Sequence, residues 1–323
     1  MITFQDTLTI INREIQSIEY PQNPAGLYEP AAYLLAMKGK KIRPALTLLS
    51  CNLYRENVEK ALNPALAWEI FHNFTLMHDD VMDKADIRRD QPTVHKKWNE
   101  NTAILSGDAM LILSYKYMAK SPLQKLNPLL DLFSQTAAEI CEGQQYDMEF
   151  EKRLEVTEDE YINMIRLKTA VMLGACLKTG AIIGEANEND QQNLYDFGIH
   201  LGIAFQIKDD ILDVYGNQDV FGKKIGGDIL CNKKTFLLIK ALETANNEDK
   251  SELLRWIQTD TQSEEKIEAV RQLYNKLGIK DLAFHAMEDY YEKAKTALQA
   301  VSVEEERKNT LMSLAMDLME REN

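Results

Sequence analysis

The stretch that decides the fold is residues 62–84, which read LNPALAWEIFHNFTLMHDDVMDK. Its apolar side chains recur at the i, i+3, i+4, i+7 spacing of a helix with a buried face, at Leu66, Ile70, Phe71, Phe74, Met77 and Val81. The stretch ends in three aspartates in the order Asp-Asp-x-x-Asp. It therefore predicts a core helix that carries carboxylates at its end.

The same acidic pattern occurs again 130 positions later, at residues 209–213. Residues i and i+4 project from one face of a helix, so the first and last aspartates of each copy lie together. Like charges at that spacing destabilise a helix, and burying them is costly unless cations neutralise them. Carboxylate oxygens are hard ligands that suit Mg²⁺. We therefore predict magnesium ligands among the six aspartates of the two motifs, Asp79, Asp80, Asp83, Asp209, Asp210 and Asp213.

The alternative is that each motif is a solvated acidic face. Apolar residues flank both motifs, at 76–77 and 81–82 around the first and at 203–205 and 211–212 around the second. Helices with such flanks should be mostly buried. The flanks therefore favour metal binding over a solvated surface.

Proline placement also indicates long helices. All eight prolines lie at or before Pro128, and proline interrupts a helix. The apolar periodicity predicts helices at 7–20, 27–38, 43–54, 62–84, 102–119, 128–150, 158–183, 190–215, 234–246, 251–258, 264–277, 281–300 and 304–320, with few strands. No low-complexity linker marks a boundary. We expect an all-α protein with a single domain over residues 1–323.

Charge and cysteine usage narrow the function further. The formal net charge of −14 argues against a nucleic-acid partner, because phosphate backbones bind clustered Lys and Arg. The four cysteines are scattered without CxxC spacing, which indicates reduced thiols. No basic segment followed by an apolar one opens the chain, and Lys178 interrupts its most apolar segment, 170–184. We expect a cytoplasmic protein with no integral membrane segment.

Basic residues and glycines gather in three predicted loops, at residues 38–44, 87–93 and 221–228. Lys and Arg bind phosphate oxygens, and metal ions bridge phosphates to carboxylates. The sequence has no glycine-rich phosphate loop ending in Lys-Ser/Thr, no dinucleotide fingerprint and no HExxH metal signature. Two acidic motifs with three basic loops therefore indicate magnesium-assisted diphosphate binding.

The order of these motifs over nearly the whole chain resembles the trans-isoprenyl diphosphate synthases of the polyprenyl synthetase family, of the short-chain, farnesyl or geranylgeranyl diphosphate synthase type. The resemblance lies in Gly39 to Pro44, His72, the first acidic motif with Arg88-Arg89, Gly143-Gln144, Lys168-Thr169, Phe205-Gln206 with the second acidic motif, Lys223, and Lys233 to Thr235. It implies a helical bundle around a central cavity, a homodimer, and about three Mg²⁺ ions with substrate bound. It also implies a prenyltransferase that joins isopentenyl diphosphate to an allylic diphosphate.

The resemblance implies a role for each matching residue. Metal ions would be held by Asp79, Asp83 and Asp209, with the other motif aspartates in the inner or outer coordination shell. The allylic diphosphate would bind Arg88, Lys168, Lys223 and Lys233, whereas isopentenyl diphosphate would bind Lys40, Arg43, His72 and Arg89. An allylic cation would face oxygen atoms of Thr169 and Gln206, and the released diphosphate would accept the proton. A purely structural role is the alternative for each of these side chains outside the acidic motifs.

Product length is expected to depend on what blocks the cavity below the first acidic motif. Phe74 lies five residues before Asp79, more than one helical turn deeper, and Phe71 lies about one further turn down. Core packing is the alternative role for both rings. In the family a bulky aromatic residue at this place accompanies short products, so we expect a C15 or C20 product.

Three positions depart from the family pattern: Lys38 and Asn232 stand where glycines are usual, and Phe236-Leu237 stands where a proline is common. These departures bear on the local geometry of Lys233 and not on the acidic motifs. A class I terpene cyclase is one alternative function, but its second metal motif would use Asn, Ser and Glu. A non-catalytic subunit that binds prenyl diphosphates is another, but such a subunit would be expected to have lost one acidic motif.

Overall fold

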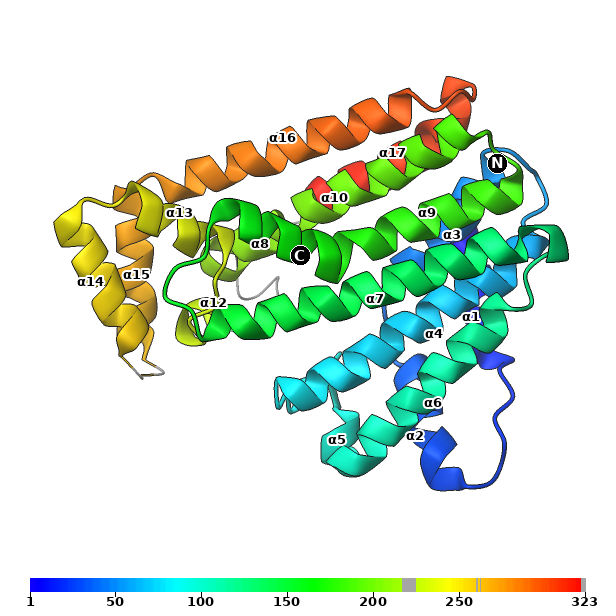
Figure 1. Cartoon of the computed structure of the whole chain (residues 1–323), viewed down its shortest axis with the longest axis horizontal. Helices are drawn as coiled ribbons and strands as arrows, with labels where there is room; N and C mark the ends of the chain where they lie inside the picture. Colours follow the sequence, from blue (N-terminus) through cyan, green and yellow to red (C-terminus); the bar gives the residue numbers. More distant parts are fainter. Residues whose placement is uncertain (217–224, 260, 262, 321–323) are drawn as a thin grey trace. The chain divides into compact units, whose positions relative to one another are not determined.

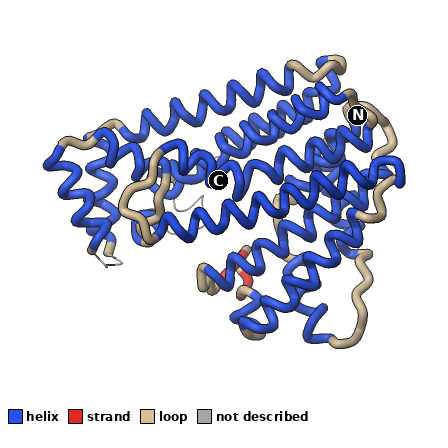
Figure 2. The backbone as a smooth tube through the Cα atoms, in the orientation of Figure 1, coloured by secondary structure: helices blue, strands red, loops and turns tan. Residues whose placement is uncertain are grey.

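The computed structural model describes residues 1–216, 225–259, 261 and 263–320, and these are almost entirely helical (Figure 1, Figure 2). The all-α prediction is confirmed. The described strands are β1 (Ile87–Arg88) and β2 (Gln91–Pro92), which form one antiparallel hairpin. The chain divides into two compact units, and the prediction of one domain over 1–323 stays a prediction.

Unit 1 comprises residues 1–134, 175–195 and 301–311. Its complete helices are α1 (Phe4–Gln16), α2 (Ala25–Ala36), α3 (Ile42–Asn52), α4 (Glu59–Met82), α5 (Val94–Lys97), α6 (Glu100–Met118) and the 3₁₀ turn η1 (Leu123–Lys125). Helix α4 packs along α6, and Figure 1 shows the two side by side. The core of unit 1 contains the rings of Trp68, Phe71 and Phe133, which meet in edge-to-face and tilted contacts.

Unit 2 comprises residues 135–174, 196–300 and those from 312 onward. Its complete elements are α8 (Glu158–Ile165), a π-helical turn η2 (Arg166–Ala170), α12 (Gly227–Leu230), α13 (Phe236–Thr244), α14 (Asn247–Gln258), α15 (Glu264–Lys276) and α16 (Ile279–Gln299). Four helices contribute residues to both units: α7 (Leu126–Glu151), α9 (Val171–Gly184), α10 (Glu188–Tyr215) and α17 (Glu305–Glu320).

The predicted helices agree with these elements apart from their ends and three local differences. The predicted helix 158–183 contains the π-helical turn η2. The predicted helix 234–246 begins only at Phe236, because the Thr235 hydroxyl accepts a hydrogen bond from the Leu238 amide and so caps α13. Helices α5 and α12 lie outside the predicted helices, since four-residue helices are too short to show a period, and the β1–β2 hairpin lies in the predicted loop 87–93.

Within the part of the chain that the structure describes, one helical stretch, 158–184, is long and apolar enough to cross a membrane by length and composition. Within it, 83% of the most apolar 18-residue window is buried inside the protein. A core helix of a soluble protein has this character.

Gly180 allows α9 to lie directly on α3 within unit 1. A Cβ atom at this position would lie 2.2 Å from the Thr47 carbonyl oxygen and 2.8 Å from the Cys51 amide nitrogen. Nearby, the Ser50 hydroxyl donates a 2.6 Å hydrogen bond to the Leu177 carbonyl. Two backbones therefore meet here with no room for a side chain.

The Gly180→Ala variant is expected to lose about 3 kcal/mol or more of unfolding free energy, because neither backbone can yield without disturbing the core. Chemical denaturation of the two proteins would measure this loss. Gly26→Ala is the matched control: Gly26 also lies in a helix, but no atom lies within 4 Å of its added Cβ, so its stability should stay equal or rise slightly. Equal stabilities of Gly180→Ala and the parent protein would contradict the close approach.

Candidate active site

The first acidic motif lies at the C-terminal end of α4 in unit 1. Asp80 is 2% exposed, and both of its carboxylate oxygens accept 2.8 Å hydrogen bonds from the Arg88 Nε. The Arg88 Nη2 adds a 2.7 Å ion pair. Asp79 is half-buried, and Asp83, one turn further, is exposed and caps the helix. Arg88 therefore neutralises the buried middle carboxylate, while its two neighbours keep more access to solvent.

The turn of the hairpin directs the two arginines to different places. Arg89 and Asp90 have φ values of 52° and 61°, the left-handed region that non-glycine residues rarely adopt. Two consecutive positive φ values produce the tight turn that matches strand twist. Arg88 is left on the strand beside Asp80, and Arg89 is turned toward a second basic group.

That second group contains Arg43 and His72. The Arg43 Nη1 lies 3.2 Å from the His72 Nε2. Burial first, and then the positive charges of Arg43 and Arg89, hold the pKa of His72 well below its usual value. The imidazole is therefore neutral, and because a guanidinium can only donate, Nε2 accepts the Arg43 hydrogen bond.

A buried ion pair lies next to this basic group. The Lys41 Nζ lies 2.9 Å from the Glu69 carboxylate, and both side chains are less than 5% exposed. The Asn73 side chain donates a further 2.8 Å hydrogen bond to the same carboxylate oxygen. Glu69 also acts electrostatically on Arg43 and Arg89. Three cations thus share one buried carboxylate, which leaves an excess of positive charge.

Arg89 has unused hydrogen-bonding capacity. Among the described residues, its Nη1 is buried with no hydrogen-bond partner. A Cβ on Gly39 would lie 2.9 Å from the Arg89 Cζ, so the guanidinium would have to move from its present place if a side chain stood there. Lys40, the next residue, is exposed. An orphaned guanidinium nitrogen in a group with excess positive charge suits a phosphate oxygen.

Aromatic rings lie on α4 before the acidic motif. The half-buried Phe74 ring lies 5.5 Å from Phe71 and 4.8 Å from His78. Phe71 is 1% exposed and lies against Trp68 and Phe133. Phe71 is therefore a core residue, whereas Phe74 borders the accessible side of the same aromatic layer.

Two aspartates of the second acidic motif, Asp209 and Asp210, line a cavity of about 110 Å³ in unit 2, whereas Asp213 does not line it. The cavity brings together six of the predicted site residues, Lys168, Thr169, Gln206, Asp209, Asp210 and Lys233. It also contains Lys234 and Thr235, which belong to the 233–235 motif but had no predicted role, and three residues that were not predicted for the site, Asp147, Tyr161 and Asp228. Lysines and carboxylates therefore line one small polar cavity.

The π-helical turn η2 presents two of these residues. The Lys168 Nζ pairs with the Asp147 carboxylate of α7 at 2.5 Å, and the Thr169 Oγ1 lies 3.4 Å from the Gln206 Oε1 of α10. A Cβ on Gly143 would lie 2.3 Å from the Lys168 backbone nitrogen, so this glycine lets α7 approach the turn. π-Helical turns often occur at functional sites.

The carboxylates on this cavity strongly affect one another. Burial and the nearby Asp228 raise the pKa of Asp210 to about 8. The same two causes raise the pKa of Asp213 to about 6. Hydrogen bonds oppose the shift: the Asp210 Oδ2 accepts from the Tyr161 hydroxyl at 2.6 Å and from the Phe236 amide at 2.9 Å. The carboxylates around Asp210 therefore repel one another despite the lysines on the cavity wall, and their oxygen donors suit a hard divalent cation.

Asp210 gives the metal-free protein a specific pH dependence. Its folded pKa of about 8 exceeds the unfolded value of 3.8, so its contribution to stability is complete below pH 3.8 and is lost as pH rises through 8. Asp210→Asn cannot ionise but keeps an oxygen for both hydrogen bonds. Thermal unfolding in a chelating buffer should therefore show the variant at least about 2 °C more stable than the parent at pH 8.5, and this advantage should shrink steadily as the pH is lowered toward 3.8. A difference that does not change with pH would contradict the raised pKa.

The predicted site residues are divided between the two units. Unit 1 holds Asp79, Asp80, Asp83, Arg88, Arg89, Lys40, Arg43, His72, Phe71 and Phe74, and unit 2 holds Lys168, Thr169, Gln206, Asp209, Asp210, Asp213 and Lys233. Lys223 lies outside the described residues. Sequence reasoning missed Glu69, although it lies one helical turn before His72 and on the same face.

Known proteins match this chain over almost its full length. The family model for polyprenyl synthetase matches residues 24–275. A geranylgeranyl pyrophosphate synthase of Geoglobus acetivorans is 37% identical over 322 residues, covering 99% of this chain and 98% of that protein. A crystal structure of a geranylgeranyl pyrophosphate synthase has a TM-score of 0.95 at 43% identity, covering 100% of both chains. The geranylgeranyl pyrophosphate synthetase of Pyrococcus horikoshii Ot3 has a TM-score of 0.92 at 34% identity, with 98% and 97% coverage. The chain therefore belongs to the polyprenyl synthetase family of trans-prenyltransferases.

Proposed function

We propose that this protein joins isopentenyl diphosphate to an allylic diphosphate with the help of Mg²⁺ and releases the C20 product, geranylgeranyl diphosphate. The observation that carries the proposal is the cavity of unit 2, where lysines and carboxylates face one another as diphosphate with magnesium requires. The choice of C20 over C15 is supported by the relatives named geranylgeranyl diphosphate synthases.

Magnesium suits the donors of both acidic motifs. Among the residues that the structure describes, no three His, Cys, Asp or Glu side chains form a ready-made metal site. Mg²⁺ in phosphate-transfer sites usually takes one or two carboxylates and completes its shell with phosphate oxygens and water. We infer that Asp79, Asp83 and Asp209 hold about three ions only together with the allylic diphosphate, and that Asp80 and Asp210 act mainly through their buried contacts.

The basic group of unit 1 would bind isopentenyl diphosphate. Arg43 and the orphaned Nη1 of Arg89 can donate to its phosphate oxygens, and the exposed Lys40 can add a further charge. Neutral His72 holds Arg43 in place through Nε2. Glu69 compensates part of the positive charge of Lys41, Arg43 and Arg89, which would otherwise destabilise the folded protein.

The reaction would proceed by electrophilic alkylation. Bound magnesium would supply charge stabilisation to the departing diphosphate. Lys168 and Lys233 would bind the same diphosphate as the carbon–oxygen bond breaks. The Thr169 and Gln206 oxygens would face the allylic cation, to which the double bond of isopentenyl diphosphate adds. Loss of one proton to the released diphosphate would then restore a double bond, without a dedicated base from the protein.

Several further properties belong to the same proposal. We infer a cytoplasmic homodimer that folds as one domain over residues 1–323 and needs no nucleic-acid partner. The formal charge of −14 supports the last point. Size-exclusion chromatography with light scattering would test the dimer.

The function is tested by incubating the purified protein with Mg²⁺, labelled isopentenyl diphosphate and either dimethylallyl, geranyl or farnesyl diphosphate. Dephosphorylated products separated by length should give C20 prenol, and none should form in a chelating buffer. C15 alone would overturn the product length but keep the reaction. Cyclic hydrocarbons, or no product from folded protein, would favour the terpene cyclase or the non-catalytic subunit.

A further inference from the structure

Lys266 is a lysine that the core of unit 2 encloses almost completely. Its side chain is 1% exposed, at the start of α15, where its amide also completes the Ser263 cap. The Nζ donates a 2.8 Å hydrogen bond to the Asn232 Oδ1 and a 3.2 Å hydrogen bond to the Thr259 carbonyl. Burying an ammonium group costs free energy, so the hydrogen bonds of the Lys266 Nζ must offset the loss of its hydration.

Asn232 occupies the position that ends α12. Its φ of 54° is left-handed, and the Asn232 amide donates to the Ile229 carbonyl at 3.2 Å. The following amide, of Lys233, donates to the Asp228 carbonyl at 3.0 Å. These two bonds are the helix-ending motif that usually uses glycine, because glycine adopts a left-handed φ without strain.

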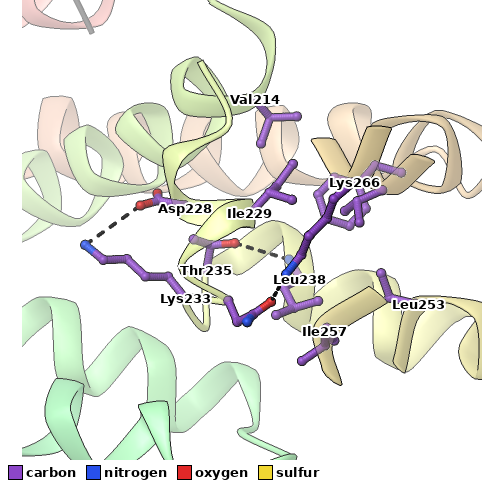
Figure 3. Close-up of a pocket in the computed structure, with 12 residues that line it drawn as sticks. Val214, Asp228, Ile229, Lys233, Thr235, Leu238, Leu253, Ile257 and Lys266 are labelled. Atoms are coloured by element: carbon purple, nitrogen blue, oxygen red, sulfur yellow. Dashed lines mark hydrogen bonds and ion pairs between the residues drawn. The ribbon is translucent and has the colours of Figure 1, made fainter. Parts of the chain in front are cut away.

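The residues that follow this turn line the acidic cavity. The Lys233 Nζ lies 3.8 Å from the Asp228 carboxylate, and the Lys234 Nζ donates back to the Asn232 carbonyl at 3.2 Å. Figure 3 shows Lys266 reaching across from α15 to this turn while Lys233 extends toward Asp228. The backbone conformation of Asn232 therefore sets the position and direction from which the Lys233 side chain extends.

We propose that Lys266 is a positioning residue for prenyl transfer: it holds Asn232 in the left-handed conformation that directs Lys233 to the allylic diphosphate. The inference rests on the proposed function. Asparagine tolerates the left-handed region less readily than glycine does, and the buried ammonium compensates by fixing its side chain. Lys266 itself contacts the turn and α14, and it acts on the substrate only through Lys233.

The test combines Lys266→Met, which keeps most of the apolar stem, with Asn232→Gly, which adopts the turn unaided. Lys266→Met should raise KM for the allylic diphosphate about tenfold, the loss expected for one hydrogen bond to a charged group, and leave KM for isopentenyl diphosphate unchanged. On the Asn232→Gly background, the same substitution should change the allylic KM by less than about twofold. Lys308→Met is the matched control, since Lys308 is 4% exposed at the start of α17 and pairs with Glu305; it should lower stability but alter neither KM.

A merely structural Lys266 would lower the melting temperature and leave both KM values unchanged, and that result would overturn the inference. If Lys266→Met does not fold, Asn232→Ala replaces it, because alanine lacks both the acceptor and the left-handed preference. A parental allylic KM in that variant would also overturn the inference. The Kd of inorganic diphosphate with Mg²⁺, measured by calorimetry, should rise in parallel with the allylic KM. This binding readout separates the two hypotheses: an inactive parent protein would refute the function, while the Kd still judges the positioning role.

Discussion

Asp209→Ala is expected to lower kcat about a thousandfold, because magnesium stabilises the departing diphosphate by several kcal/mol and this carboxylate is proposed to hold it. Asp209 is half-buried on the cavity that also contains Lys168 and Asp228. Steady-state rates with farnesyl and isopentenyl diphosphate over a range of Mg²⁺ concentrations would measure the effect. The variant should also need more Mg²⁺ for half-maximal rate.

The matched control is Asp196→Ala, which removes a carboxylate from the same helix α10, 13 positions earlier and not on the cavity wall. Its kcat should stay within about twofold of the parent value, as is usual for substitutions away from the reacting groups. Equal losses in the two variants would indicate a general effect on α10 and would refute the ligand role of Asp209.

Phe74→Ala is expected to shift the main product from C20 to C25 or longer. The half-buried Phe74 ring borders the accessible side of the aromatic layer, and its removal would leave Phe71 as the next barrier. The loss of stability should stay below the roughly 3–5 kcal/mol typical of a fully buried ring. Chromatography of the dephosphorylated products would report the new length.

The aromatic control for this experiment is Phe284→Ala on α16, since Phe284 is 39% exposed and lies in unit 2. That variant should keep the C20 product. An unchanged product length from folded Phe74→Ala would refute the role of this ring in the chain-length barrier. The next candidates for that barrier would then be the partly buried Leu113 and Tyr117, which pack on the same core cluster.

The elements with strong periodicity could be predicted from the sequence, and those set by single contacts could not. Helix α4 was expected at 62–84 and spans Glu59–Met82, because its apolar residues keep the helical period from Leu66 to Val81, about four turns. The turn η2 was missed, since five residues inside a nearly continuous apolar stretch show no change of period. The hairpin was missed because Arg89 and Asp90 adopt positive φ values without the glycine that usually signals such a turn.

The site residues likewise include some that a sequence pattern indicated and others that only the folded structure reveals. Repeated spacing indicated the six motif aspartates, and the order of motifs indicated the basic residues. Asp228 and Asp147 stand outside the two Asp-Asp-x-x-Asp motifs, although both lie on the cavity. Lys41 and Glu69 are far apart in sequence, and only the packing of α3 on α4 makes them a buried pair.

The π-helical turn at Arg166–Ala170 has a consequence for length changes in this helix. A wide turn accommodates one more residue than an α-helical turn, and each residue in a regular helix adds about 100° of rotation and about 1.5 Å of rise. Deleting a single residue within it would therefore restore a regular helix rather than break it. The shortened helix would still fold, but Lys168 and Thr169 could no longer reach Asp147 on one wall and Gln206 on the other. A one-residue deletion in this turn would therefore give a protein that folds but no longer binds substrate.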